Sequence, residues 1–318
     1  MHPMKSLDDL RRRLGPTRRV FALFHPLLPE EPLVILHVHL ENSTDIIPAT
    51  MTHVLKEVDN SDNDYDKDDA VRQSQARVTP RVATFYSISN TQPGLTRGLG
   101  LGEFLIKNAV QLLQKEFPTS LETFVTLSPL PGFRDWIEML TKTPDLSETE
   151  MSHTEWIKHL ARTGTLSENV IHVLSKTPSS RNQLYELLQS TKKTESLVRD
   201  DDSVHPSLTD QLEEIEPLLT KLAACYLLLA KNPRSGKPID PVAGFHVHNG
   251  AEVYRINFAA DLSRKGLLRS FGVMVNYKYT LESIDRNKAL YETSQYSEIA
   301  MSPGLSGMLA GSDWKDMP

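Results

Sequence analysis

A group of glycines at residues 97–102 has the composition of a turn that binds phosphate. The segment reads Arg97-Gly98-Leu99-Gly100-Leu101-Gly102 and lies between an expected strand and an expected helix. Backbone amides at the start of a helix attract phosphate, and glycines let a ligand approach them closely. The dinucleotide-binding pattern G-x-G-x-x-G does not fit, because Glu103 stands where the third glycine would be. A Walker loop does not fit either, because no Gly-Lys-Ser/Thr follows.

The spacing of the arginine and the glycines does fit Arg/Gln-x-x-Gly-x-Gly, the coenzyme A pyrophosphate loop of the acetyltransferase-like (GNAT) fold. The spacing thus suggests, without deciding it, a coenzyme A site that includes Arg97, Gly98, Gly100 and Gly102. An ordinary strand-to-helix turn is the alternative, since glycine-rich turns before helices are common.

Ser128 is the second candidate for chemistry. It follows an expected strand and precedes Pro129 and Pro131-Gly132. Proline restricts the backbone, so the hydroxyl of Ser128 would be held in one place. No Gly-x-Ser-x-Gly motif surrounds it, which argues against the nucleophile of an α/β-hydrolase. A serine that caps a turn is the alternative interpretation.

His246 and His248 form the third candidate. We predict that they lie on a strand, where a spacing of two residues places both imidazoles on one face. His37 and His39 repeat this spacing. We find no clustered carboxylate that would complete a metal site, so we predict none. The remaining hypotheses for His246 are a single catalytic histidine and a buried structural one.

Composition excludes several classes of protein. The 318 residues are 39% hydrophobic and 24% charged, which is enough to build a large core. The formal net charge of −6 argues against a general nucleic-acid binder. The single cysteine, Cys225, excludes an intrachain disulfide and a thiolate-rich zinc site, and we expect it to pack in an apolar helix. The longest apolar runs are too short for a membrane-spanning helix.

Alternating and helical patterns predict the elements that hold these residues. Strands are expected at 18–25, 33–40, 81–89, 121–127 and 270–280, with a β-hairpin at 244–257 around Asn249-Gly250. Helices are expected at 5–14, 46–58 and 103–117. The acidic segment 59–77 should be disordered, 134–232 should form a helical insertion, and 296–318 should be an irregular tail. Together these elements predict a mixed α/β (α+β) sheet.

Several motifs in the same order resemble the malonyl-CoA decarboxylase family. The resemblance covers about residues 7–295, with gaps at the acidic segment and the helical block. The residues that carry it are Arg12–Arg19, Glu31–Val38, Phe85–Ser89, Leu101–Lys107, Leu127–Phe133, Phe245–Ala251, Arg255–Asn257, Ala260-Asp261 and Asn276–Tyr279.

The resemblance implies a GNAT-like catalytic domain over residues 1–295. It also implies that the helical oligomerisation domain, which precedes the catalytic domain in the family, is absent from this chain. A serine and a histidine of the family's motifs carry out the decarboxylation, and they match Ser128 and His246. A tyrosine of the family matches Tyr279. The family also supports the interpretation of the glycine-rich segment as the coenzyme A site.

The activity that the resemblance implies is the decarboxylation of malonyl-CoA to acetyl-CoA and CO2. We expect Ser128 to orient the malonyl thioester and His246 to protonate the enolate, with no metal and no organic cofactor. The expected partner is malonyl-CoA, with no nucleic acid and no membrane, and a homo-oligomer is an option. The termini carry no clear targeting signal, which favours the cytoplasm, whereas the family also allows mitochondria or peroxisomes.

Two other functions stay open. A GNAT-type acyl-CoA N-acyltransferase would explain the glycine-rich segment equally well, but it needs an amine acceptor. A non-catalytic malonyl-CoA-binding relative would bind the same compound without turning it over.

Overall fold

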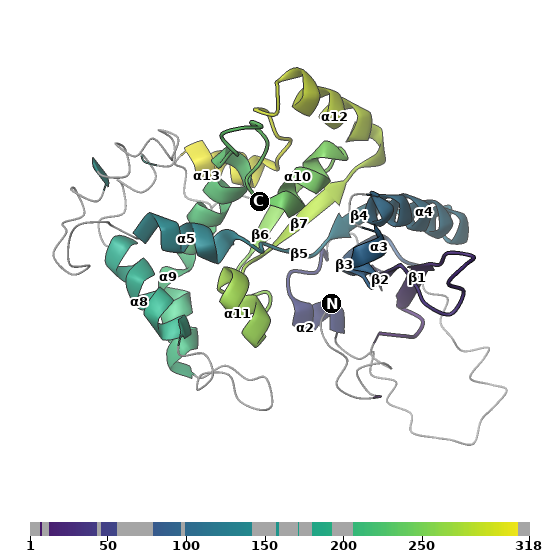
Figure 1. Ribbon diagram of the computed structural model, residues 1–318, viewed down its shortest axis with the longest axis horizontal. Coiled ribbons are helices and arrows are strands. Elements are labelled where there is room, and N and C mark those ends of the chain that lie inside the picture. Colours follow the sequence, from purple (N-terminus) through teal and green to yellow (C-terminus); the bar gives the residue numbers. More distant parts are fainter. Residues whose placement is uncertain are drawn as a thin grey trace. The chain divides into compact units, whose positions relative to one another are not determined.

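The computed structural model describes residues 7, 13–42, 46–55, 79–96, 99–141, 157–158, 171, 180–192 and 206–310 (Figure 1). The chain divides into two compact units, Met1–Leu127 and Ser128–Pro318. Each unit contains its own strands and helices, which confirms the expected mixed α/β class. The proposed domain boundaries, with one catalytic domain over 1–295, stay a prediction.

Where the structure describes it, the first unit is built on four strands. They are β1 (Arg18–Leu23), β2 (Val34–Glu41), β3 (Val82–Asn90) and β4 (Thr123–Thr126). β1, β2 and β3 pair antiparallel, and β4 pairs parallel to β3. Five consecutive residues of β2, from Leu36 to Leu40, are buried, as expected for a central strand covered on both faces. All four strands were expected within a few residues of these bounds.

The described residues of the first unit include three helices: α2 (Met51–Leu55), α3 (Pro93–Thr96) and α4 (Leu101–Glu116). The long helix α4 buries Leu105, Ala109 and Leu113, which recur at a spacing of four residues and so share one face. α4 contacts β1 and β2. Its start is two residues earlier than predicted, inside the glycine-rich segment.

The second unit contains a sheet of three short strands, with β7 (Met274–Tyr279) between β5 (Ser128–Pro129) and β6 (Glu252–Asn257). All pairings are antiparallel, with Ser128 opposite Val275 and Val253 opposite Tyr277. The opposed residues lie on the same face of the sheet, so Ser128 and Tyr277 project to one side. This register sets the positions of the candidate catalytic residues.

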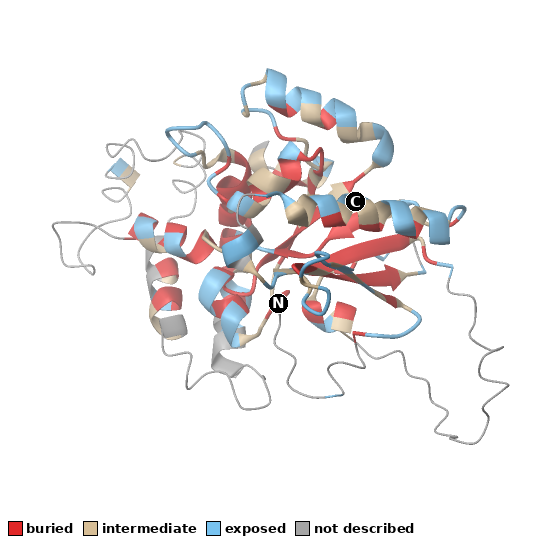
Figure 2. Cartoon of the chain, turned by 45° about the vertical axis from the view of Figure 1, so that its right-hand side comes forward, coloured by how far each residue is buried: buried red, intermediate tan, exposed pale blue. Residues whose placement is uncertain are grey.

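Helices make up most of the described residues of the second unit. They are α5 (Phe133–Thr141), α8 (Ser180–Lys192), α9 (Pro206–Ala224), a π-helical turn (Cys225–Leu229), α10 (Pro241–His248), α11 (Arg264–Ser270), a 3-10 turn (Leu281–Ser283), α12 (Ile284–Thr293) and α13 (Pro303–Ala310). The described part of 134–232 is thus mainly helical, and its assignment as an insertion stays a prediction. Buried residues gather in the strands and on the inner faces of the helices (Figure 2). Within the described ranges, none of these helices is long and apolar enough to cross a membrane.

The predicted hairpin at 244–257 is wrong in its first half. Residues 241–248 form the helix α10, and only 252–257 form a strand. Asp240 caps the helix by accepting a hydrogen bond from the amide of Ala243 at 2.7 Å, and Pro241 occupies the first helical position. Asn249-Gly250 ends this helix instead of forming a hairpin turn, because Gly250 has a φ of +82° and its amide bonds to the carbonyl of Val247.

The tail predicted to be irregular contains the helix α13. Leu305 and Met308 are buried there, and α13 packs on α9 and β6. The two apolar side chains lie three residues apart on one helix face. This pattern is too short to predict a helix from the sequence. The predicted acidic segment 59–77 lies outside the described residues.

Candidate active site

His246 lies at the centre of a group of side chains in the second unit. Its Nε2 atom is 3.4 Å from Oγ of Ser128, and its Nδ1 atom is 2.7 Å from the hydroxyl oxygen of Tyr279. The ring of Tyr277 stacks on the imidazole, with 4.3 Å between the centroids and 23° between the planes. The sequence analysis placed Ser128, His246 and Tyr279 in one site, and the structure brings them together.

Three elements position this group. β5 supplies Ser128, β7 supplies both tyrosines, and α10 supplies His246. Tyr277 and Tyr279 are two residues apart on β7, so they face the same side, toward α10. The sequence analysis missed Tyr277, although the alternation Tyr-x-Tyr on a predicted strand was a usable signal.

His246 and His248 do not form a pair. On a helix, two residues separated by two positions point about 200° apart, so the expected shared face is lost. His246 is buried and His248 is exposed. The correction to a helix therefore removes this pair as a metal site and leaves His246 alone in the group.

Burial controls the protonation of His246. It lowers the pKa of the imidazole to about 3, because a cation is poorly solvated in this apolar setting. His246 is thus neutral at pH 7, with one ring nitrogen that donates and one that accepts. Burial also raises the pKa of Tyr277 far above the range in which tyrosine ionises in water. The site is a set of neutral hydrogen-bonding groups rather than charged ones.

The glycine-rich segment lies in the first unit, at the start of α4. Gly100 is the residue before the helix and has a φ of +63°, a left-handed conformation that glycine adopts without strain. No side chain caps the helix there. The first amides of α4 have no partner carbonyl within the helix, which suits an anion. Gly102 lies within the first turn, whereas Arg97 and Gly98 lie outside the described residues.

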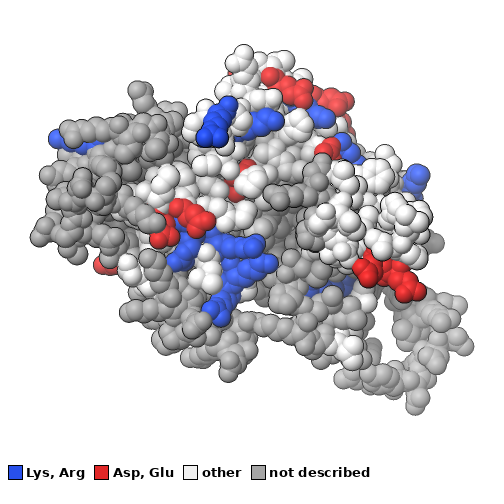
Figure 3. Space-filling view, in the orientation of Figure 1, with Lys and Arg blue, Asp and Glu red and all other residues white. Residues whose placement is uncertain are grey.

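Cationic side chains gather over α11 in the second unit (Figure 3). This helix carries Arg264, Lys265 and Arg269, and all three are exposed. α11 contacts β5, the strand that holds Ser128. The surface beside this strand is therefore suited to attract an anionic compound.

Comparison with known proteins identifies the family. The model of the malonyl-CoA decarboxylase C-terminal domain matches residues 1–317 of the chain. This chain belongs to the malonyl-CoA decarboxylase family. The family resemblance drawn from the sequence motifs is thereby confirmed.

Mitochondrial malonyl-CoA decarboxylases of goose (Anser anser anser) and mouse (Mus musculus) are similar to the chain. They share 37% and 36% identity over 92% of this chain, but the matches cover only 50% and 51% of those proteins. The chain thus spans about half the length of these curated relatives.

Solved malonyl-CoA decarboxylases have the same fold. The chain is 34% identical to the structure from Agrobacterium vitis, with a TM-score of 0.68 over 97% of this chain and 61% of that one. The structure from Rhodopseudomonas palustris gives 33% identity and a TM-score of 0.64, over 97% of this chain and 57% of that one.

Proposed function

We propose that this chain decarboxylates malonyl-CoA to acetyl-CoA and CO2. The observation that carries the proposal is the contact of His246 with both Ser128 and Tyr279, within a chain that belongs to the malonyl-CoA decarboxylase family. The relatives are named for this activity.

The reaction breaks the bond between the carboxylate carbon and the α-carbon of the malonyl group. The electron pair of this bond moves into the thioester as CO2 leaves, and negative charge develops on the thioester oxygen. A hydrogen bond aimed at this oxygen lowers the barrier. The Ser128 hydroxyl supplies this hydrogen bond in our proposal and so orients the thioester.

His246 supplies the proton that converts the enolate into the methyl group of acetyl-CoA. Since the imidazole is neutral at pH 7, the donor is its Nε2–H group, while Nδ1 accepts a hydrogen bond from Tyr279. The α-carbon of a thioester is a far weaker acid than an imidazole N–H, so transfer to carbon is downhill. As Nε2 loses its proton, Nδ1 keeps the hydrogen bond from the Tyr279 hydroxyl, and a proton from solvent then restores the Nε2–H group for the next turnover.

The coenzyme A part of the substrate is assigned to the glycine-rich segment, with Arg97, Gly98, Gly100 and Gly102 around the pyrophosphate. The left-handed backbone at Gly100 and the uncapped start of α4 support this assignment. The exposed cations of α11 would attract the phosphates and the malonyl carboxylate as the substrate approaches.

The experiment is to incubate the purified chain with malonyl-CoA alone in deuterated water, without added metal. We expect CO2 and acetyl-CoA with one deuterium in its methyl group. An acyltransferase would form no acetyl-CoA at all. Once an amine is added, it would release free coenzyme A and form a malonyl amide that keeps the carboxylate. Thermal stabilisation by malonyl-CoA without turnover would instead indicate a non-catalytic binding protein.

A further inference from the structure

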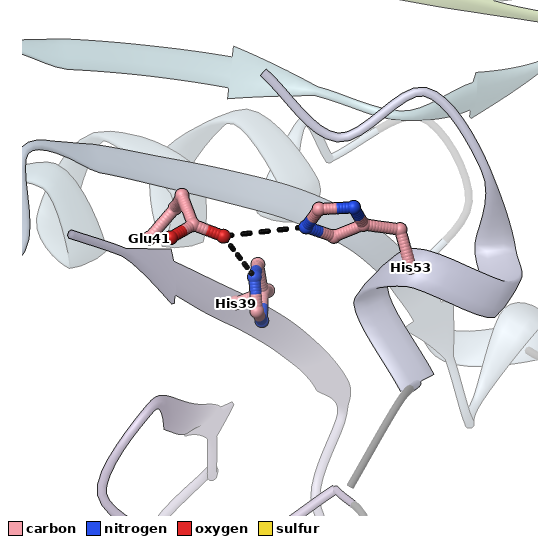
Figure 4. Close-up of side chains that lie close together, drawn as sticks. All are labelled: His39, Glu41 and His53. Carbon is pink, nitrogen blue, oxygen red and sulfur yellow. Dashed lines mark hydrogen bonds and ion pairs between the residues drawn. The ribbon is translucent and has the colours of Figure 1, made fainter. Parts of the chain in front are cut away.

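Three side chains of the first unit lie together outside the group around His246. They are His39 and Glu41 on β2 and His53 on α2 (Figure 4). Oε2 of Glu41 is 3.5 Å from Nε2 of His39 and 3.2 Å from Nε2 of His53. One ligand atom from each residue lies within 4.8 Å of the other two. The two ring nitrogens thus converge on one carboxylate oxygen.

Local structure holds each of the three in place. His39 and Glu41 are two residues apart on a strand, so they face the same side. The other carboxylate oxygen of Glu41 accepts a hydrogen bond from the amide of Asn42 at 2.9 Å. The hydroxyl of Thr50 accepts a hydrogen bond from the amide of His53 at 3.1 Å and caps α2. The group is therefore organised by backbone contacts that do not depend on a ligand.

The donor set and its spacing suit a transition metal. Zinc binds imidazole nitrogen and carboxylate oxygen at about 2.0–2.2 Å in a tetrahedral arrangement, which places neighbouring ligands about 3.4 Å apart. The two distances from Glu41 to the ring nitrogens are close to this spacing. The side chain of His39 is 8% exposed and that of His53 is 38% exposed, so an ion can enter from the side of His53.

We propose that His39, Glu41 and His53 bind one divalent transition-metal ion, with zinc preferred, which fastens α2 to β2. Oxygen-seeking ions such as Mg²⁺ are disfavoured, because two of the three ligands are imidazoles. Water would complete the fourth position on the exposed side.

Arg18 sets the strength of this site. Its Nη1 atom contacts Nδ1 of His39, so in the metal-free protein the proton of the ring is on Nε2, facing Glu41. A metal bound at Nε2 replaces that proton, and the neutral ring then carries its proton on Nδ1. Nδ1–H can no longer accept a hydrogen bond from Arg18, and the two N–H groups repel each other. The same Nη1 also donates to the carbonyl and hydroxyl oxygens of Thr17 at 3.1 Å, so these contacts can hold the guanidinium when His39 no longer accepts from it.

Metal titration of the full chain tests the proposal. Protein treated with a chelator is titrated with ZnCl2 alone in a calorimeter, and with Co²⁺, whose visible spectrum reports tetrahedral coordination. We expect one site per chain, an intense tetrahedral Co²⁺ spectrum, and a rise in melting temperature with zinc. His53→Gln and Glu41→Gln should each weaken binding by about 100-fold or more, and both residues are exposed enough for the variants to fold.

Two further variants make the test specific. His25→Gln removes an exposed histidine outside the group, so it should leave the affinity unchanged. Arg18→Gln replaces the conflicting donor by a group that can accept from Nδ1, so it should tighten zinc binding by about 10-fold. Absence of stoichiometric binding to the parent chain, or equal binding by the parent, His53→Gln and Glu41→Gln, would overturn the proposal and leave the three residues as a hydrogen-bonded link.

Discussion

The hydroxyl oxygen of Tyr279 lies 2.7 Å from Nδ1 of His246, at the opposite edge of the ring from Ser128. This contact assigns different tasks to the two ring nitrogens, because a neutral imidazole donates through one and accepts through the other. Tyr279 is therefore a positioning residue, which acts on the substrate through His246.

Replacing Tyr279 by phenylalanine should lower kcat by about 3–10-fold, because one hydrogen bond contributes about 0.5–1.5 kcal/mol. KM for malonyl-CoA should stay unchanged, since the tyrosine has no task in binding coenzyme A. Steady-state kinetics measures both constants. A variant with the kcat of the parent chain would show that the ring orientation does not depend on this hydroxyl.

His246→Gln should reduce kcat by about 10²–10⁴-fold, the usual contribution of a general acid. Glutamine fills much of the same space, so the loss should exceed any change in folding, which a thermal melt checks. His248→Gln, which alters an exposed histidine on the same helix, is the matched control and should retain normal turnover. Near-normal turnover by His246→Gln would refute the assigned proton donor.

Ser128→Ala should reduce kcat by about 10²–10³-fold, as expected for removal of one donor to a developing oxyanion. Ser120→Ala removes another buried serine hydroxyl and serves as the control. Initial rates over a range of malonyl-CoA concentrations separate kcat from KM. A rise in KM at constant kcat would mean that Ser128 binds substrate and transition state equally.

Acid should destabilise the folded chain between about pH 6.5 and pH 3 through His246. Its folded pKa is lowered to about 3 while its unfolded value is near 6.5, so only the unfolded state binds the proton in this window. The free energy of unfolding should therefore fall by about 1.4 kcal/mol per pH unit from this residue. Burial lowers the pKa of His37 to about 4, so His37 also makes the free energy of unfolding fall as the pH falls.

Urea unfolding at pH 7, 6 and 5 measures this slope. His246→Gln should unfold with a shallower dependence on pH than the parent chain. Equal slopes for the parent chain and His246→Gln would contradict the neutral, buried state of His246.

Replacing Gly250 and Gly244 by alanine should change the stability of the chain in opposite directions. A Cβ at Gly250 would lie 2.5 Å from the carbonyl oxygen of Ile284, at a φ of +82°, so Gly250→Ala should cost about 2 kcal/mol or more. A Cβ at Gly244 would meet nothing within 4 Å inside the helix, so Gly244→Ala should stabilise by about 0.5–1 kcal/mol. Equilibrium unfolding of the pair measures both, and a destabilised Gly244→Ala would argue against the helix.

Local patterns predicted much of this fold because their signals are complete within a few residues. The β-branched and aromatic residues of Val34–Glu41 and Val82–Asn90 are such a signal, as is the four-residue spacing of Leu105, Ala109 and Leu113. The wrong prediction of a strand at Pro241–His248, which forms a helix, has an equally local cause. Two periodicities compete over eight residues there, and the Asp-Pro start outweighs the alternating Phe-His-Val-His.

The sequence by itself determined the family, the mixed α/β class, and the candidates Ser128, His246 and Tyr279, because ordered motifs and local periodicity are written along the chain. Tertiary structure alone decided that His246 stacks on Tyr277, that His248 faces away, and that His53 approaches Glu41. These relations depend on which distant segments pack together. Strand register and helix phase set that packing, and neither is encoded in the spacing of any single motif.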